Sequence, residues 1–161
     1  MFHKILVGVE DLETGRAMFD AALSLAKSLK SQLMIARVLS PLKDYYTTPG
    51  MPVSRGIYPT LSDELLEAYM KQWQAHEKEG MDLLQALAGE ANAAGVEAEF
   101  TQNFGDAGRT LCEVARAWDA DLIVVGRRGR TGISELILGS VSNYVLHHAP
   151  CAVLTVQGMD T

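Results

Sequence analysis

The sequence has 161 residues and a formal net charge of −6 at pH 7, with 48% hydrophobic and 21% charged residues. This length and balance predict a single globular domain, 1–161, whose core needs no disulfide bonds. The acidic charge excludes a broad nucleic-acid or anionic-membrane surface, because either would need an extended basic face. No window approaches the ~20 apolar residues of a membrane span, so we expect a cytoplasmic protein without a membrane partner.

Strand and helix patterns alternate from the start of the chain. Residues 4–9, KILVGV, form a short apolar run typical of a strand buried on both faces. Apolar residues at helical spacing follow over 13–31, and the run at 32–39 predicts a second strand. The chain therefore opens with a βαβ unit, whose two strands are expected to be parallel.

A long connection is predicted at about 40–62. It holds four of the five prolines and the tyrosines 45, 46 and 58. Connections of this length are uncommon in compact domains and often serve as lids or binding loops. Two interpretations stay open here, a tyrosine-rich lid over a ligand and a mobile surface excursion.

The second half of the chain continues the alternation. A long helical pattern begins at Asp63, with Gly80 and Gly89 as candidate points for a bend or break. Its apolar face consists of Leu66, Met70, Trp73, Gly80, Leu84, Leu87 and Ala91. Further segments read as a strand at 96–102, a helix at 105–120, a strand at 121–126, a helix at 139–149 and a strand at 151–156. Five strands alternating with four helices predict a three-layer α/β sandwich.

The stretch 124–142, VVGRRGRTGISELILGSVS, carries the strongest functional signal. Gly126 and Gly129 follow a predicted strand, and Gly139 stands at the start of a predicted helix. In open parallel sheets, ligands bind beyond the carboxyl ends of the strands. Glycines let a ligand approach the backbone closely, and a helix start offers N–H groups to an anion. Groups that could bind phosphate nearby are Arg127, Arg128, Arg130, Ser140 and Ser142.

Each of these residues alone has a simpler interpretation. The glycines are suited to turns, Ser140 to a helix N-cap, and loop arginines to solvent. Their combined spacing favours a polyphosphate site. The chain has no GxxxxGK[ST] loop and no GxGxxG after its first strand, which argues against a P-loop NTPase and a dinucleotide-dependent dehydrogenase.

The spacing G-x2-G-x9-G-S resembles the motif of the ATP-binding type of the universal stress protein family. The segments HKILVGVE and GSVSNYVLHHAPCAVLTV also resemble the family's beginning and ending. The resemblance implies an adenine nucleotide alpha hydrolase-like, Rossmann-like fold with a five-stranded parallel sheet in the order 3-2-1-4-5. It implies ATP as ligand, with AMP or cyclic AMP as alternatives and Mg²⁺ as a companion ion. The residues it assigns to the nucleotide are Gly8, Val9, Glu10, Val38, Val125, Gly126, Arg127, Arg128, Gly129, Arg130, Gly139, Ser140, Val141 and Ser142.

The chain departs from the family pattern at two places. Glu10 stands where the family usually has Asp, and its longer side chain would shift the contact with the nucleoside. The segment 105–108, GDAG, stands where many members have a proline that begins the next helix. The second departure should affect rigidity rather than chemistry.

No residue is assigned a catalytic or metal-binding role. His147 and His148 adjoin Cys151, but imidazoles near a helix C-terminus also complement the helix dipole. Asp11 and Glu13 could hold a magnesium ion that arrives with ATP, although acids early in a helix also complement the dipole.

We therefore expect a nucleotide-binding regulatory protein of the stress response, with weak ATPase activity at most. The alternatives are a slow ATP hydrolase that uses loop 40–62 as a lid, and a protein-interaction module with a vestigial nucleotide pocket.

The strand 151–156 would lie at one edge of the implied sheet. It is apolar and carries no lysine to discourage pairing with another strand. We expect it to pair with its copy in a two-fold homodimer, as the resemblance also implies.

Overall fold

The computed structural model describes residues 1–10, 12–40, 63–127 and 139–157. Within these ranges five strands and four helices alternate as the sequence predicts. The elements are β1 (Lys4–Gly8), α1 (Leu12–Leu29), β2 (Gln32–Leu39), α3 (Asp63–Ala93), β3 (Ala98–Phe104), α4 (Ala107–Trp118), β4 (Leu122–Gly126), α5 (Ser140–His148) and β5 (Ala152–Val156). The predicted loop 40–62 lies outside the described residues beyond Ser40.

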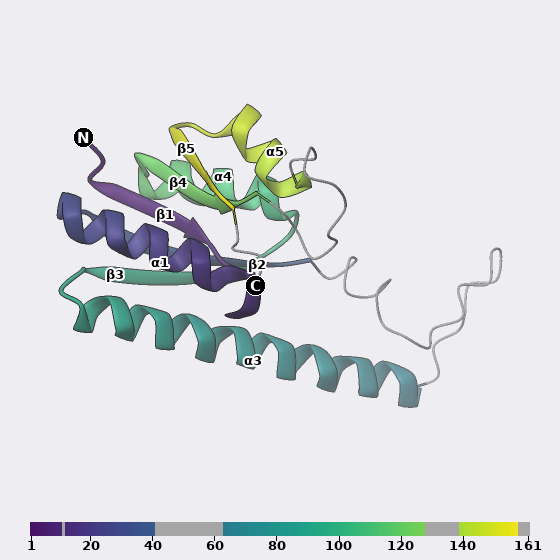
Figure 1. Cartoon of the computed structure of the whole chain (residues 1–161). Helices are drawn as coiled ribbons and strands as arrows, with labels where there is room; N and C mark the ends of the chain where they lie inside the picture. The colour runs from purple at the N-terminus through teal and green to yellow at the C-terminus, as the bar shows by residue number, and fades with distance from the viewer. Residues whose placement is uncertain (11, 41–62, 128–138, 158–161) are drawn as a thin grey trace.

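The five strands form one parallel sheet in the order β3-β2-β1-β4-β5, which confirms the expected fold class. Helices α1 and α3 cover one face of the sheet and α4 and α5 the other, as Figure 1 shows. The core on the α1/α3 side includes Phe19, Ile35 and Leu84. The core on the α4/α5 side includes Leu6 and Leu111. The central strands β1 and β4 are buried on both faces, which is why their sequences are continuous apolar runs.

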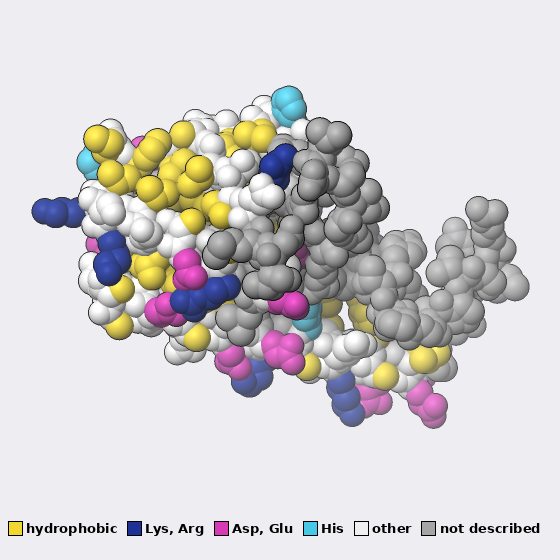
Figure 2. Space-filling view, viewed as in Figure 1, with side chains coloured by type: hydrophobic (Ala, Val, Ile, Leu, Met, Phe, Trp, Pro, Cys, Tyr) yellow, Lys and Arg dark blue, Asp and Glu magenta, His cyan; other side chains and the backbone are white. Residues whose placement is uncertain are grey.

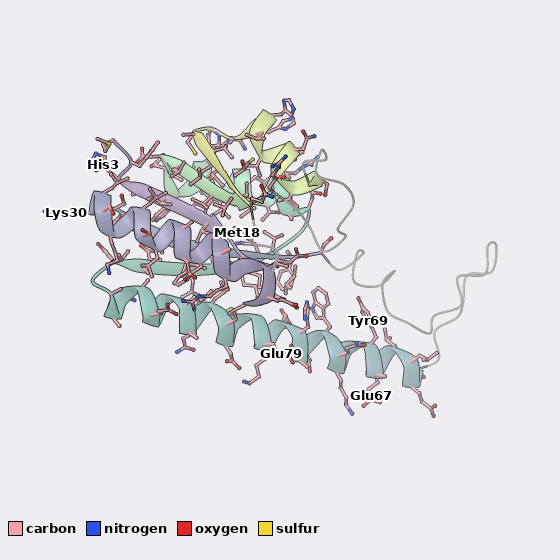
Figure 3. The ribbon with its side chains drawn as sticks, in the orientation of Figure 1. His3, Met18, Lys30, Glu67, Tyr69 and Glu79 are labelled. Atoms are coloured by element: carbon pink, nitrogen blue, oxygen red, sulfur yellow. The ribbon has the colours of Figure 1, made fainter. Side chains whose placement is uncertain are left out.

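Helix α3 is longer than the sheet that it covers. It runs unbroken through Gly80 and Gly89, so the expected bend or break at these glycines is wrong. Its first turns extend past the sheet, where Figure 3 labels Glu67 and Tyr69. As a result Leu66 and Met70 are 45% and 54% exposed, although their spacing matches the buried face.

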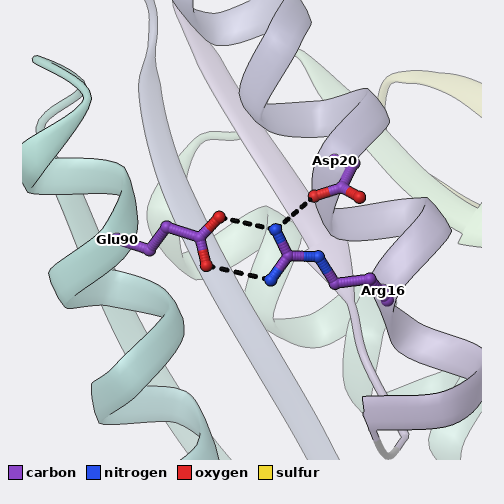
Figure 4. Close-up of polar contacts among 3 residues, drawn as sticks. All are labelled: Arg16, Asp20 and Glu90. Atoms are coloured by element: carbon purple, nitrogen blue, oxygen red, sulfur yellow. Dashed lines mark hydrogen bonds and ion pairs between the residues drawn. The ribbon is translucent and has the colours of Figure 1, made fainter.

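Helices α1 and α3 are also joined by a bidentate ion pair. Arg16 donates from Nη2 to Oε1 of Glu90 at 2.6 Å and from Nη1 to Oε2 at 2.9 Å, and it pairs with Asp20 at 2.9 Å (Figure 4). The Arg16 guanidinium lowers the pKa of the Glu90 carboxyl below its ordinary value. All three side chains are close to half exposed, so solvent screening keeps their contribution to stability small.

At the amino ends of the strands, side chains hold the backbone. Oδ2 of Asp121 accepts the N–H groups of His3 at 2.7 Å and Lys4 at 2.9 Å, which ties the start of β4 to the start of β1. These two hydrogen bonds lower the pKa of the Asp121 carboxyl. The Ser31 hydroxyl donates to the carbonyl of Phe2 at 2.6 Å, which fixes the turn before β2. Figure 3 marks this end of the sheet with His3.

No helix among the described residues is long and apolar enough to cross a membrane.

Candidate functional site

The candidate site lies where β1 and β4 end. These strands are neighbours, but the chain continues from β1 to β2 on one side and from β4 to β5 on the other. Such a reversal of strand order opens a crevice beyond the carboxyl ends, where open α/β sheets bind their ligands.

The end of β1 supplies three of the predicted residues. Gly8 packs closely on α4, because an added Cβ would lie 3.0 Å from Cδ1 of Leu111. Val9 is buried, and its N–H donates to the Ala36 carbonyl at 2.9 Å, so β1 keeps its pairing with β2 one residue past its last strand residue. Glu10 follows as an exposed residue at the rim. Gly8 therefore has a packing reason of its own, and Glu10 is accessible to a ligand.

The backbone brings together two parts of the glycine motif that are separated in sequence. The Arg127 N–H donates to Val156 at 2.8 Å, which extends the β4–β5 ladder by one residue. The Arg127 carbonyl accepts the N–H of Gly139 at 2.8 Å. The end of β4 and the start of α5 therefore meet directly, although residues 128–138 lie between them in sequence and outside the described structure. The predicted residues Arg128, Gly129 and Arg130 belong to that undescribed segment.

Helix α5 begins with a glycine N-cap. Gly139 has φ −57° and ψ 153° and makes no side-chain cap, so Ser140 is the first helical residue rather than the N-cap. Any residue can adopt these backbone angles, so the chain conformation alone does not require glycine here. Ser142 is 1% exposed, and its hydroxyl donates to the Gly139 carbonyl at 2.9 Å. The first N–H groups of a helix have no partner within the helix and suit an anion.

Apolar side chains form the α4/α5 side of the same edge. Val125 belongs to the buried core on this side. The half-buried Val38 and Val141 pack against that core. A flat apolar ring of a ligand would find its contacts here. Arg127 is half-buried and donates from Nη1 to Oε1 of Gln157 at 3.2 Å.

One feature near the site has no counterpart in the sequence-based prediction. Arg37, on β2, is 6% exposed and donates from Nε to the Glu10 carbonyl at 2.9 Å. The only sequence signal for it is an arginine inside the apolar run 32–39.

The histidines of α5 are engaged in local contacts. The ring of His148 stacks on Tyr144 with 4.0 Å between ring centroids, and its Nδ1 lies 2.8 Å from the Tyr144 carbonyl. Cys151 is a free thiol whose pKa is raised by burial. Within 1–10, 12–40, 63–127 and 139–157, no three or more His, Cys, Asp or Glu residues are grouped so that they could hold a metal ion.

Comparisons with known proteins show related sequences and structures that share this fold. A family model described as "Universal stress protein family" matches residues 1–157. The chain is 34% identical to universal stress protein Sll1388 of Synechocystis sp. over 160 residues, covering 97% of this chain and 98% of that protein. It is 45% identical to universal stress protein Slr1101 of the same organism over 105 residues, covering 65% of this chain and 97% of that protein.

Solved structures share the fold at lower identity. The hypothetical protein MJ0577 matches with a TM-score of 0.79 and 18% identity, over 100% of this chain and 99% of that one. A universal stress protein family member from Arabidopsis thaliana with AMP bound matches with a TM-score of 0.64 and 21% identity, over 98% and 92% of the chains. A universal stress protein in complex with cAMP matches with a TM-score of 0.60 and 23% identity, over 97% of each chain.

Proposed function

Because the chain belongs to the universal stress protein family, we propose that it binds ATP where β1 and β4 end and acts as a nucleotide-dependent regulatory homodimer in the stress response. In this proposal the presence or absence of bound nucleotide sets the regulatory state of the protein, and any hydrolysis of ATP is slow.

The observation that carries the proposal is the contact between Gly139 and Arg127. This 2.8 Å backbone hydrogen bond sets the start of α5 against the end of β4, beside the end of β1. The α5 amides and the positive end of the helix dipole then face the crevice in which a ligand would lie. Solved structures of the same fold with AMP and cAMP bound support an adenine nucleotide as the ligand.

The proposal assigns the residues the following roles. Val38, Val125 and Val141 offer apolar contacts to the adenine ring, and 8–10 border the nucleoside. The α5 start, 139–142, receives the phosphates together with Gly126 and Arg127. From the sequence, we also assign Arg128, Gly129 and Arg130 to the phosphates. The two arginines would supply positive charge, and the glycine would let the backbone approach closely. Mg²⁺ would arrive with ATP as its companion ion.

The test is calorimetric titration of the wild type with ATP, AMP, cyclic AMP and adenosine, repeated with two variants at Gly139. Asn and Asp are both favourable N-cap residues, so neither Gly139→Asn nor Gly139→Asp should disrupt the start of α5. Both add bulk, but only Asp adds a negative charge where phosphates are proposed.

We expect both variants to bind ATP at least tenfold more weakly than the wild type, with Gly139→Asp about tenfold weaker than Gly139→Asn, since a like charge within a few ångströms costs over 1 kcal/mol. The gap between the two variants should vanish for adenosine, which has no phosphate. Gly89→Ala is the matched control, because its added Cβ meets nothing within 4 Å. Wild-type affinity for ATP in both variants would refute the assignment.

The homodimer is proposed to form through β5. This strand is at the edge of the sheet, and hydrophobic side chains gather over it in the upper left of Figure 2. The Ala152 N–H donates to the Asp121 carbonyl and the Val156 carbonyl accepts the Arg127 N–H, at the two ends of β4. Since successive residues of a strand alternate in direction, Val153 and Thr155 turn their N–H and C=O groups toward the open edge. Because β5 has no strand on its outer side in the described sheet, we propose that these groups pair with the same strand of a second copy.

A proline at the open edge tests the dimer without damage to the sheet. Thr155→Pro removes an N–H that points away from β4, a position that edge strands tolerate. We expect this variant to be monomeric by light scattering and still folded by circular dichroism. Thr155→Val keeps the N–H and should remain dimeric. A dimeric Thr155→Pro would place the interface elsewhere.

A further inference from the structure

A groove with a volume of about 440 Å³ lies between helices α1 and α3. Arg16 lines it from α1. The α3 side consists of residues at i, i+3, i+4, i+7, i+8 and i+11, which share one face of the helix: Glu79, Asp82, Leu83, Ala86, Leu87 and Glu90. At a helical rise of about 1.5 Å per residue, this side of the groove is about 16 Å long. The groove is therefore elongated along α3.

The floor of the groove is apolar. Leu87 is 4% exposed and belongs to the core on the α1/α3 side, and the half-buried Leu83 packs against that core. Ala86 is exposed, and its side chain is a single methyl group that leaves space above the leucines. The leucines are held by the core, so a partner could bury apolar side chains on them without first ordering this surface.

Carboxylates form the rim of the groove. Asp82 accepts a hydrogen bond from Nζ of Lys78 at 2.7 Å, and Glu90 pairs with Arg16, as Figure 4 shows. Glu79, labelled in Figure 3, is exposed and has no ion-pair partner among the described residues. Three carboxylates and one guanidinium line the groove, so its formal charge is −2.

Helix α3 as a whole holds most of the negative charge of the chain. It contains seven Asp or Glu residues and two lysines, so its formal charge is −5, whereas that of the chain is −6. Acidic side chains recur along the lower edge of the molecule in Figure 2, where Figure 1 places α3. Charge gathered on one element attracts partners of the opposite sign. The groove therefore favours a cationic partner.

We propose that this groove is a docking site for an amphipathic helix of a partner protein that carries lysine or arginine beside its apolar face. A helix of about three turns matches the length of the groove. Its apolar residues would pack on Leu83 and Leu87, in the helix-in-groove mode of peptide recognition. Its cations would pair with Glu79 first, and then with Asp82 and Glu90, whose present ion pairs are exposed and therefore weak.

A second copy of this chain does not match the groove. No described helix carries more than two Lys or Arg residues, and α3 itself would bring like charge to the rim. The proposed homodimer uses β5, none of whose residues lines the groove. The partner is therefore a different protein.

The test is the binding of a fluorescent peptide to the full chain, measured by anisotropy at physiological ionic strength, which screens long-range attraction. The probe is a synthetic amphipathic helix of leucine and lysine, about four turns long. A second peptide has glutamate in place of lysine. We expect the wild type to bind the lysine peptide at least tenfold more tightly than the glutamate peptide.

Charge reversal shows where the peptide binds. Glu79→Arg puts a cation on the rim, and Glu113→Arg makes the same change at an exposed residue of α4, on the other face of the sheet. We expect at least fivefold weaker binding of the lysine peptide by Glu79→Arg and less than a twofold change for Glu113→Arg. The two variants have the same net charge, so a general attraction to the acidic chain would weaken both alike.

Filling the groove is a second route to the same loss. Ala86→Trp places a large side chain over the floor, and Ala117→Trp is the matched control at an exposed position of α4. We expect at least fivefold weaker binding by Ala86→Trp and wild-type binding by Ala117→Trp. Circular dichroism establishes whether Ala86→Trp is folded, and if it is not, the charge-reversal pair still decides.

The outcomes are independent of the proposed function, because the assay contains no nucleotide. No binding of the lysine peptide by the wild type would overturn the inference. Equal weakening by Glu79→Arg and Glu113→Arg would also overturn it, since the peptide would then not lie in the groove. Either result would leave the proposed ATP site untouched.

Discussion

At the amino ends of the strands, the side chain of Asp121 accepts backbone N–H groups, whereas at the carboxyl ends the side chains of Arg37 and Ser142 donate to backbone carbonyls. Asp121 and Ser31 tie neighbouring strands together at the first end. At the second end, the contacts include the Gly139–Arg127 hydrogen bond and the extension of β1 at Val9.

The difference shows how one sheet can separate stability from binding. Side chains that satisfy backbone groups at the amino end leave fewer groups free for a ligand. At the carboxyl end Gly139 provides no side-chain cap for α5, so among the described residues no N-cap side chain occupies the first N–H groups of the helix. We therefore expect substitutions at the amino end to change the free energy of unfolding, and substitutions at the carboxyl end to change nucleotide affinity.

The largest effect is expected at a position where one substitution should change both stability and nucleotide affinity. Gly108 lies in the first turn of α4, and an added Cβ would lie 2.8 Å from Cβ of Tyr144 on α5. Gly108→Ala should therefore push α5 away, costing about 1–3 kcal/mol of stability through overpacking and weakening ATP binding as the α5 start moves. Urea denaturation and calorimetric titration measure the two effects. Unchanged stability would show that the α4–α5 contact adapts freely.

A smaller effect, on stability alone, is expected at the amino end. Asp121→Ala removes both hydrogen bonds to β1 and should cost about 1–2 kcal/mol in urea denaturation. The Kd for ATP should not change. A weaker affinity for ATP would contradict the separation of the two ends.

The same substitution has a defined pH dependence. The folded-state pKa of Asp121 is lowered, chiefly by the hydrogen bonds from His3 and Lys4. The contribution of Asp121 to the free energy of unfolding is therefore complete above the ordinary aspartate pKa of about 3.9. It is lost as the pH falls through the lower pKa that the carboxyl has in the folded state. The stability difference between the wild type and Asp121→Ala should be constant near neutral pH and shrink in acid.

The smallest effect is expected for the Arg16 ion pairs, of which the pair with Glu90 joins α1 to α3 and the pair with Asp20 lies within α1. Their side chains are 43–52% exposed, so Arg16→Ala should cost less than about 1 kcal/mol despite the bidentate geometry. The loss should decrease in 1 M salt, because salt screens exposed charges. A larger loss that salt does not reduce would indicate that packing of the Arg16 stem dominates.

Much of the fold could be predicted from local patterns. The apolar runs of β1 and β4 identify central strands because these strands are buried on both faces. Glycine is also suited to the position just past α3, since the helix ends at Ala93 and Gly95 has φ +84°. The predicted burial of Leu66 failed, because periodicity identifies one face of a helix but not how far the sheet extends beneath it.

The candidate site was predicted only in part. The predicted pattern of strands and helices placed Gly126 at the end of β4 and Gly139 at the start of α5. It did not reveal Arg37, because a single charge inside an apolar strand carries no information on the side chains from β3 and α3 that surround it. It also did not explain Gly80, whose role depends on the same tertiary contact.

Backbone amide hydrogen exchange with and without ATP tests the central claim most directly, that the carboxyl end of the sheet is the end that binds. We predict slower exchange at 8–10 and 139–142 when ATP is present, and no change at 31–33 and 119–122. Slowing at both ends alike, at the amino end alone, or at neither end would contradict the account.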